Sequence, residues 1–360
     1  MRVPRWLVAE LTYKCPLRCA YCSNPVNISS KGELSTKEWL KAFEQARALG
    51  SVQLGLTGGE PLMRPDLLEL VRETRKMGYY TNLITSSMGL TEKRLDNLKA
   101  AGLDSVQISF QAEQRNLNDF LAGKQSYEHK MKMMRAVKER NIPLTLNVVL
   151  HRLNIDRMSE ICALCESMDP DYVELASMQA HGWAKVNAGV LMPTPRQVER
   201  AQAAIATYQK RSRSSGEIFY VLPDLIERRA KNCHNGWGEM YICINPQGSV
   251  TPCLSALTIP EVKSKVQNVK TASIQDIWEG PVFKLFRGKE WMKDEGAKNS
   301  PRRHVEGNGC RCQAYALTGD ARNMDPACST SSHHDSFLEW MKDTYESEKK
   351  EIRPRTLQTA

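Results

Sequence analysis

The chain has 360 residues, a formal net charge of +9 and a charged fraction of 25%. These values suit a globular protein with a main domain and a smaller appended one, and they exclude collagen-like and disordered chains. Basic residues are scattered, no apolar signal region precedes the first predicted strand, and no stretch reaches membrane-spanning length. We therefore expect a cytoplasmic protein that binds neither nucleic acid nor a membrane.

Strand and helix patterns alternate along the first half of the chain. Residues 35–38, Ser-Thr-Lys-Glu, are typical of a capping box, and apolar residues recur at helical spacing after them. Six such units predict a parallel sheet with helices outside it, in the form of a partial (β/α)6 TIM barrel that is open on one side. The predicted strands cover residues 6–12, 52–56, 80–85, 105–110, 144–149 and 172–176.

The composition changes after a long polar helix predicted at residues 194–213. Strand alternation weakens there, and six cysteines fall between Cys233 and Cys328. This part has too few apolar residues for a core of its own, so we expect metal to stabilise it. The predicted organisation is a barrel domain at 1–215, a cysteine-rich domain at 216–330 and a mobile tail at 331–360, which has no periodic apolar face beyond Met341.

Three cysteines, Cys15, Cys19 and Cys22, follow the first predicted strand in a CxxxCxxC spacing. Three thiolates can hold one corner of a cubane iron-sulfur cluster and leave its fourth iron open, which indicates catalysis. Zinc is the alternative, but a structural zinc site usually has a fourth ligand close by in sequence, and none follows. In a reducing compartment the 11 cysteines are better metal ligands than disulfide partners.

A second motif, Thr-Gly-Gly-Glu-Pro at residues 57–61, follows the second predicted strand. Gly58 and Gly59 let the backbone approach a ligand closely, and Glu60 can accept a hydrogen bond from an ammonium group. A tight turn with a solvated glutamate is the alternative. In parallel sheets the active site gathers at the carboxyl ends of the strands, so both motifs are expected at one rim.

Together the two motifs resemble those of the radical S-adenosylmethionine superfamily. The resemblance implies that the open iron chelates the amino and carboxylate groups of S-adenosylmethionine. Reductive cleavage then gives a 5'-deoxyadenosyl radical that abstracts a substrate hydrogen. It also implies that residues 58–61, which are Gly58, Gly59, Glu60 and Pro61, bind this cofactor, with ribose or methionine contacts from Ser109, Gln111 and Asn147.

The later cysteines resemble the SPASM extension of peptide-modifying radical enzymes, which holds auxiliary iron-sulfur clusters. Four thiolates can close one cluster completely, as a 2Fe-2S or a 4Fe-4S centre, which points to electron transfer or structure. Zinc with the same four ligands is the alternative. The candidate ligands are Cys233, Cys253, Cys310 and Cys312, with Cys328 left over.

Further short motifs extend the resemblance to PqqE, the radical enzyme family of pyrroloquinoline quinone biosynthesis. This implies a carbon-carbon bond between a glutamate and a tyrosine side chain of a precursor peptide, PqqA. It also implies a PqqD-like peptide chaperone and a flavodoxin-type or other one-electron reductant as partners. The motifs include residues 11–13, 21–25, 107–111, 182–184, 236–238, 309–314 and 318–320.

One interval departs from that family. Residues 293–300 contain no cysteine, where the family places two further ligands. Because Glu306 and Cys328 alone do not hold a cubane securely, a second auxiliary cluster is predicted to be absent or rebuilt. The loss favours, as an alternative, a divergent enzyme that acts on another peptide or bond; a zinc-stabilised peptide-binding protein is the alternative without catalysis.

Three other cysteines do not fit the family pattern. Cys162 and Cys165 lie in a predicted amphipathic helix and are expected in the core. Cys243 has no predicted role.

Overall fold

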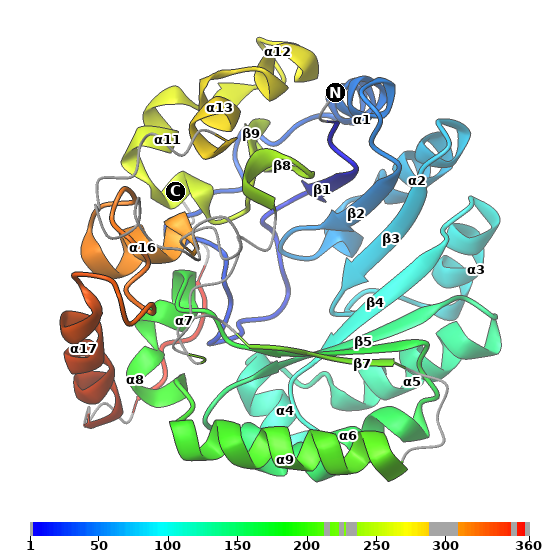
Figure 1. Ribbon diagram of the computed structural model, residues 1–360. Coiled ribbons are helices and arrows are strands. Elements are labelled where there is room, and N and C mark those ends of the chain that lie inside the picture. Colours follow the sequence, from blue (N-terminus) through cyan, green and yellow to red (C-terminus); the bar gives the residue numbers. More distant parts are fainter. Residues whose placement is uncertain are drawn as a thin grey trace.

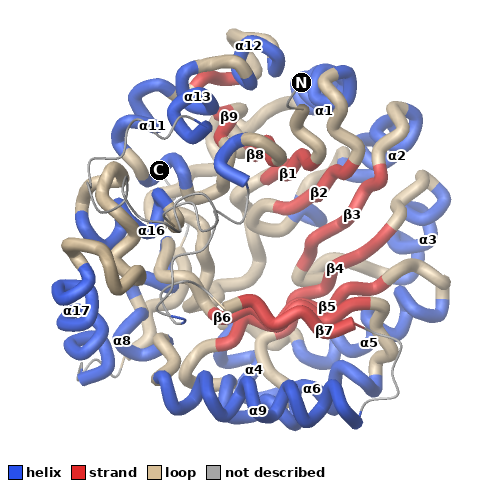
Figure 2. Tube along the Cα trace, viewed as in Figure 1, coloured by secondary structure: helices blue, strands red, loops and turns tan. Residues whose placement is uncertain are grey.

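A ten-stranded sheet is the centre of the computed structural model, which describes residues 3–211, 217–222, 227, 236–287, 309–346 and 351–356. The strands are β1 (Trp6–Glu10), β2 (Gln53–Thr57), β3 (Tyr80–Thr85), β4 (Ser105–Phe110), β5 (Leu144–Leu150), β6 (Tyr172–Ser177), β7 (Glu217–Val221), β8 (Tyr241–Ile244), β9 (Ser249–Thr251) and β10 (Gln267–Asn268). Their order across the sheet is β10-β9-β8-β1-β2-β3-β4-β5-β6-β7, so the sheet curves without closing (Figures 1 and 2).

Helices cover the outer face of the curved sheet (Figure 1). In the barrel they are α1 (Thr36–Ala48), η1 (Pro61–Met63), α2 (Leu67–Lys76), α3 (Glu92–Ala100), α4 (Arg115–Ala122), α5 (Tyr127–Glu139), η2 (Ile155–Arg157), α6 (Met158–Ser167), α7 (Gly182–Val186), α8 (Ala188–Leu191) and α9 (Pro195–Arg211). Beyond it lie η3 (Gly236–Gly238), η4 (Ala256–Thr258), α11 (Pro260–Lys265), α12 (Ile274–Trp278), α13 (Pro281–Arg287), α16 (Arg311–Thr318) and α17 (His334–Glu346).

The structure confirms the predicted partial barrel. Strands β1 to β7 pair in parallel with their sequence neighbours. The capping box also forms, because Ser35 accepts from the backbone of Glu38 while the Glu38 side chain accepts from the backbone of Ser35. The sheet continues beyond the six predicted strands, since β7 pairs with β6 past the predicted domain boundary at residue 215.

Strand β8 joins the C-terminal part of the chain directly to the barrel. It pairs in parallel with β1, from Trp6 beside Tyr241 to Ala9 beside Ile244. Ile242 and Ile244 are fully buried and belong to the same apolar core as Leu7. Burial of each such side chain stabilises the fold by roughly 1.5–3 kcal/mol, so the two parts share this core. The C-terminal part also has a smaller apolar cluster of its own, which includes Ile259, Val262 and Phe286.

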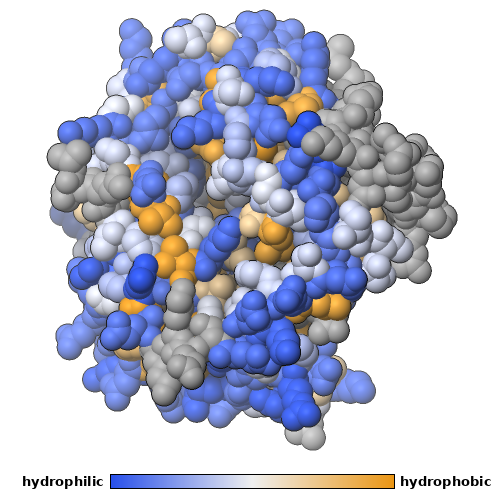
Figure 3. All heavy atoms as spheres, turned by 90° about the vertical axis from the view of Figure 1, so that its left-hand side faces the viewer, coloured by the Kyte–Doolittle hydropathy of each residue, from blue (hydrophilic) through white to orange (hydrophobic). Residues whose placement is uncertain are grey.

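The region after Ser331, predicted as a mobile tail, is largely helical where it is described. Phe337 and Met341 are one helical turn apart in α17 and pack with Ala188 and Met192. One apolar pair is too short a pattern to predict a helix from the sequence, especially beside the charged residues 346–350. Residues 347–350 and 357–360 lie outside the described part. From the side of α16 and α17, Figure 3 shows hydrophobic side chains in small groups among hydrophilic ones.

None of the helices in the described part of the chain is long and apolar enough to cross a membrane.

The shared core makes a testable prediction about stability. We expect Ile242→Ala to lower the free energy of unfolding by about 2–5 kcal/mol, because it leaves a cavity between the barrel and the C-terminal part. Since the core is common, urea unfolding should stay a single transition. Val52→Ala, at a side chain that is 46% exposed, is the control and should change stability by less than about 0.5 kcal/mol. Two separate transitions, with only one shifted, would contradict the shared core.

Candidate functional site

A cavity of about 200 Å³ lies where the carboxyl ends of the first strands meet. It is lined by both predicted motifs and by the ends of the third and fourth strands. The lining residues include Cys15, Cys19, Cys22, Gly58, Gly59, Thr85, Ser86, Ser109, Gln111 and Arg355. The structure therefore brings together the three cysteines of the first motif and the glycine pair of the second, as expected from strand polarity.

The cysteine loop is held in place through its backbone. The Arg18 N–H donates to the carbonyl of Ala122 at the end of α4 (2.8 Å), and the Trp183 N–H of α7 donates to the carbonyl of Cys22 (2.9 Å). The side-chain amide of Asn187 donates to the carbonyl of Ala20 (2.8 Å). These contacts fix the loop from both sides, which is what a multi-thiolate site requires.

Gly58 and Gly59 are needed because the cysteine loop passes directly against them. A Cβ at Gly58 would lie 2.4 Å from the carbonyl oxygen of Thr12, and one at Gly59 would lie 2.5 Å from that of Lys14. The Gly59 N–H donates to the Thr12 carbonyl at 2.6 Å. The glycines thus make room for the backbone of residues 12–14, and not only for a ligand as the sequence analysis predicts.

Glu60 is fully buried and its carboxylate is surrounded by protein donors. One oxygen accepts from the Leu62 N–H (3.1 Å) and the Thr85 hydroxyl (2.6 Å), and the other accepts from the N–H (2.8 Å) and hydroxyl (2.5 Å) of Ser86. Burial raises its pKa. Glu60 therefore ties the turn to the end of β3, while Pro61 begins η1. An ammonium contact to Glu60 stays a prediction, and it requires one of these four bonds to give way.

Burial dominates the electrostatics of the three thiols. It raises the pKa of Cys15 to about 12 and that of Cys22 to about 11, and it raises the pKa of Cys19 as well. The guanidinium of Arg355 acts on all three in the opposite direction. A bound metal centre would supply the remaining charge that thiolates need in such a site.

Ser109 and Gln111 line the cavity, and their contacts with a cofactor stay predictions. Oε1 of Gln111 is buried and has no hydrogen-bond partner among the described residues, so it can accept from a ligand hydroxyl or amine. Asn147 lies beside Ser109 on the neighbouring strand β5, but it does not line the cavity, and its amide donates to Glu174 of β6 (2.9 Å). Its contact with a cofactor stays a prediction.

A second thiol group forms in the C-terminal part. The thiol of Cys312 is in hydrogen-bond contact with those of Cys253 and Cys310, and these contacts, followed by burial, raise its pKa well above the ordinary value. Cys310 is the N-cap residue of α16 and Cys312 lies in its first turn. The positive end of the helix dipole favours thiolates there.

Asp325 positions this second group. Its buried carboxylate accepts from the Cys310 N–H (3.0 Å), the Gln313 amide (2.9 Å) and the Ala327 N–H (3.0 Å). A Cβ at Gly309 would lie 2.3 Å from the Asp325 side chain. Asp325 is a positioning residue that the sequence analysis missed, since an isolated aspartate carries no recognisable signal.

The other cysteines have separate surroundings. Cys328 contacts the Thr330 hydroxyl (3.2 Å). Cys162 and Cys165 are buried in α6, which confirms them as core residues, and Cys243 is buried in β8. Cys233, Glu306 and the cysteine-free interval 293–300 lie outside the described residues.

Metal geometry differs between one ion and a cluster. Among the residues that the structure describes, no three or more His, Cys, Asp or Glu side chains are placed so that they could hold a single metal ion. In a cubane cluster each thiolate binds an iron of its own, so its ligands need not converge on one point.

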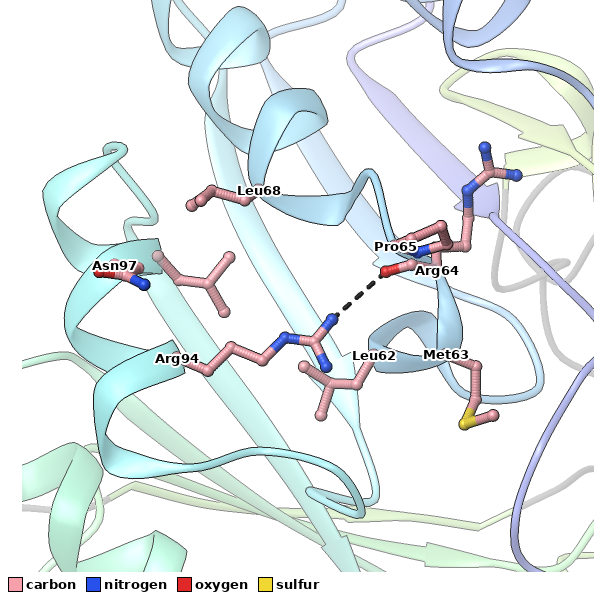
Figure 4. A pocket seen from close by; sticks show the side chains of 8 residues that line it. Leu62, Met63, Arg64, Pro65, Leu68, Arg94 and Asn97 are labelled. Carbon is pink, nitrogen blue, oxygen red and sulfur yellow. Dashed lines mark hydrogen bonds between the residues drawn. The ribbon is translucent and has the colours of Figure 1, made fainter.

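Another hollow, of about 360 Å³, lies between η1, α2 and α3 (Figure 4). It is lined mainly by Leu62, Met63, Leu68 and Leu98, with Arg94 donating across it to the carbonyl of Arg64 at 3.3 Å. No thiol lines this hollow, so we place the chemistry in the cysteine-lined cavity.

Comparisons with known proteins agree with this geometry. Residues 9–165 match the family model of the radical SAM superfamily, and residues 233–312 match that of the SPASM domain, an iron-sulfur cluster-binding domain. The two matches imply a 4Fe-4S cluster with S-adenosylmethionine at the first thiol group and auxiliary iron-sulfur clusters at the second. The residues present fit these groups, because clustered thiols, the unpartnered Gln111 oxygen and the backbone of Gly58 and Gly59 line one cavity.

Solved structures share the fold at low identity. SuiB of Streptococcus suis bound to S-adenosylmethionine is 17% identical, with a TM-score of 0.76 over 91% of this chain and 78% of that one. SuiB bound to the precursor peptide SuiA is 16% identical, with a TM-score of 0.75 over 92% of this chain and 76% of that one. Native anSMEcpe with bound AdoMet is 13% identical, with a TM-score of 0.67 over 94% of this chain and 97% of that one.

The glycine cradle makes a prediction about cluster assembly. We expect Gly59→Ala to push the cysteine loop out of place at a cost of about 1–3 kcal/mol, and so to lower the iron and sulfide bound after anaerobic reconstitution. Gly55→Ala is the matched control in the preceding strand, where the added carbon would meet only Ile84 Cδ1 at 3.4 Å. If both variants bind the same amount of iron, Gly59 does not support the cysteine loop, and its role is limited to letting a ligand approach.

The second thiol group makes a prediction about cluster number. If it closes one auxiliary site, the reconstituted protein should hold about two clusters per chain. Replacing Cys310 and Cys312 together by Ala should leave the first cluster only, whereas Cys328→Ala should change the iron content little. Mössbauer spectroscopy gives the count. A third cluster, or a large iron loss in Cys328→Ala, would show that the other site has been rebuilt.

Proposed function

We propose that this chain, a radical SAM superfamily enzyme with a C-terminal SPASM domain, modifies a ribosomally made precursor peptide. The proposed reaction is the carbon-carbon crosslink between a glutamate and a tyrosine side chain of a PqqA-like peptide in pyrroloquinoline quinone biosynthesis. The observation that carries the peptide-modifying role is the presence of a thiol-lined cavity together with a second thiol group, whose Cys253 follows the β8–β9 hairpin of the same sheet.

The residues of the cavity have distinct proposed roles. Cys15, Cys19 and Cys22 would hold the cluster, and S-adenosylmethionine bound to it supplies the power to abstract an unactivated hydrogen. Gln111 and Ser109 would orient the cofactor through hydrogen bonds at the rim. Cys253, Cys310 and Cys312, with Cys233, would hold an auxiliary cluster.

The peptide partner is supported by a structural relative. SuiB, which shares this fold, has been solved with its precursor peptide SuiA. For the present chain we propose a PqqA-like peptide, a PqqD-like chaperone that presents it and a flavodoxin-type or other one-electron reductant. The choice of glutamate and tyrosine rests on the sequence motifs that resemble PqqE.

The net change in the peptide can be stated from the bonds. One carbon-hydrogen bond breaks on the glutamate side chain and one on the tyrosine ring, and one carbon-carbon bond forms. The peptide thus loses two hydrogens and is oxidised by two electrons. One hydrogen atom would pass to the 5'-deoxyadenosyl group that S-adenosylmethionine supplies, and the other would leave as a proton and an electron, for which the auxiliary cluster would be the acceptor. The crosslinked peptide is therefore lighter than the substrate by the mass of two hydrogens, and its amino-acid sequence is unchanged.

A second candidate function is favoured by residues 293–300, which lack the cysteines of the PqqE family. It is a divergent SPASM enzyme that acts on another precursor peptide or forms another bond. Both candidates use the same cavity, so the product distinguishes them.

The test uses the reconstituted full chain, S-adenosylmethionine, a chemical or flavodoxin reductant and short peptides encoded beside its gene, with and without a small chaperone encoded there. We expect a product lighter by two hydrogens, whose fragmentation places the crosslink between glutamate and tyrosine. Cys19→Ala is the control, and it should cleave no S-adenosylmethionine because two thiolates do not retain the cluster.

The outcomes separate the proposals. A modification at other residues, or a different mass change, would support the divergent enzyme. Cofactor cleavage that survives in Cys19→Ala would overturn the assignment of the radical site.

A further inference from the structure

The C-terminal segment 351–356 returns to the cysteine loop at the start of the chain. Ile352 packs with Ala20, Ala184 and Leu191 in one apolar cluster. The backbone of Arg353 forms two hydrogen bonds with the side chain of Asn187, each 2.8 Å long. In Figure 1 this segment lies in red beside α7 and α8.

Asn187 connects the segment 351–356 directly to the cysteine loop. Its amide nitrogen donates both to the carbonyl of Arg353 and to that of Ala20 in the cysteine loop. The Arg355 N–H donates to the Arg18 carbonyl at 3.2 Å. The segment is therefore docked onto the loop by main-chain hydrogen bonds and by an apolar contact.

Docking places the guanidinium of Arg355 in the cysteine-lined cavity. Arg355 is only 3% exposed, and its Nη2 donates to the carbonyl of Tyr13 at 2.8 Å. Its Nε is buried without a hydrogen-bond partner among the described residues. No carboxylate of the described part pairs with it. Because a buried cation without a counter-ion is costly, we expect this site to hold an anion beside the guanidinium.

The surrounding thiols indicate which anion completes the site. Arg355 lines the same cavity as Cys15, Cys19 and Cys22, which would hold the cluster. A cluster held by three thiolates carries negative charge, and each electron that it accepts adds one more. A charge in a buried site interacts over several ångströms with little screening.

We propose that Arg355 is a positioning residue of the radical site: it compensates the negative charge of the cluster held by Cys15, Cys19 and Cys22 and favours its reduced state. The segment 351–356 is then the element that closes this site. The inference rests on the proposed radical site and does not depend on which bond the enzyme forms in its substrate peptide.

The first test measures the reduction potential of the open-iron cluster by a redox titration followed with electron paramagnetic resonance, without S-adenosylmethionine. We expect Arg355→Met to shift the potential to a more negative value, because it removes the charge and keeps most of the length. Arg355→Lys should restore most of the shift. Arg353→Met is the matched control, since it alters an exposed side chain of the same segment, and it should leave the potential unchanged.

Iron release to a chelator is a second measurement that does not depend on turnover. Arg355→Met should lose the iron of the radical cluster roughly tenfold faster, as expected when a supporting contact of a metal site is lost. Ile352→Asp should do the same while keeping Arg355, because a carboxylate does not fit the apolar cluster and the segment should undock.

Three results would overturn the proposal. The first is an unchanged potential in Arg355→Met. The second is a loss in Arg355→Lys equal to that in Arg355→Met, which would show that packing and not charge matters. The third is a shift that appears only when S-adenosylmethionine is present, which would assign Arg355 to the cofactor carboxylate instead.

Discussion

The close approach of two backbones, that of residues 12–14 and that of Gly58-Gly59, is the constraint on which the site depends. With a carbonyl oxygen 2.4 Å from the position of a Gly58 Cβ, no side chain is tolerated there. The pairing of β1 with β2 aligns the two turns, and hydrogen bonds from Gly59 and Glu60 to the loop complete the contact. The glycine motif is thus structural support for the cysteine motif as well as a surface for a ligand.

Strand β1 has a similar role on a larger scale. It lies between β2, which leads to the glycine turn, and β8, which begins the hairpin before Cys253. The first thiol group and Cys253 of the second are therefore attached to one sheet. Side chains of the shared core, such as Leu7 and Ile242, resist any movement of one group relative to the other because packed interiors deform little.

Much of this was predictable from the sequence. Periodicity and the capping box at Ser35 predict the six barrel units, and the spacing of Cys15, Cys19 and Cys22 predicts the site. Strands β7 and β8 were not predicted, because each is short and depends on a distant partner strand. Arg355 carries no local signal, since its burial results from contacts with residues at the other end of the chain.

Those contacts span the whole sequence: Arg355 and Tyr13 are 342 positions apart. Contacts between residues so far apart in the sequence form more slowly than local ones. During synthesis the cysteine loop leaves the ribosome long before the segment that covers it. Until that segment is made, its contacts with the cysteine loop are absent from the nascent barrel. Assembly of the metal centre and completion of the fold are, in this architecture, coupled by the order in which the chain is made.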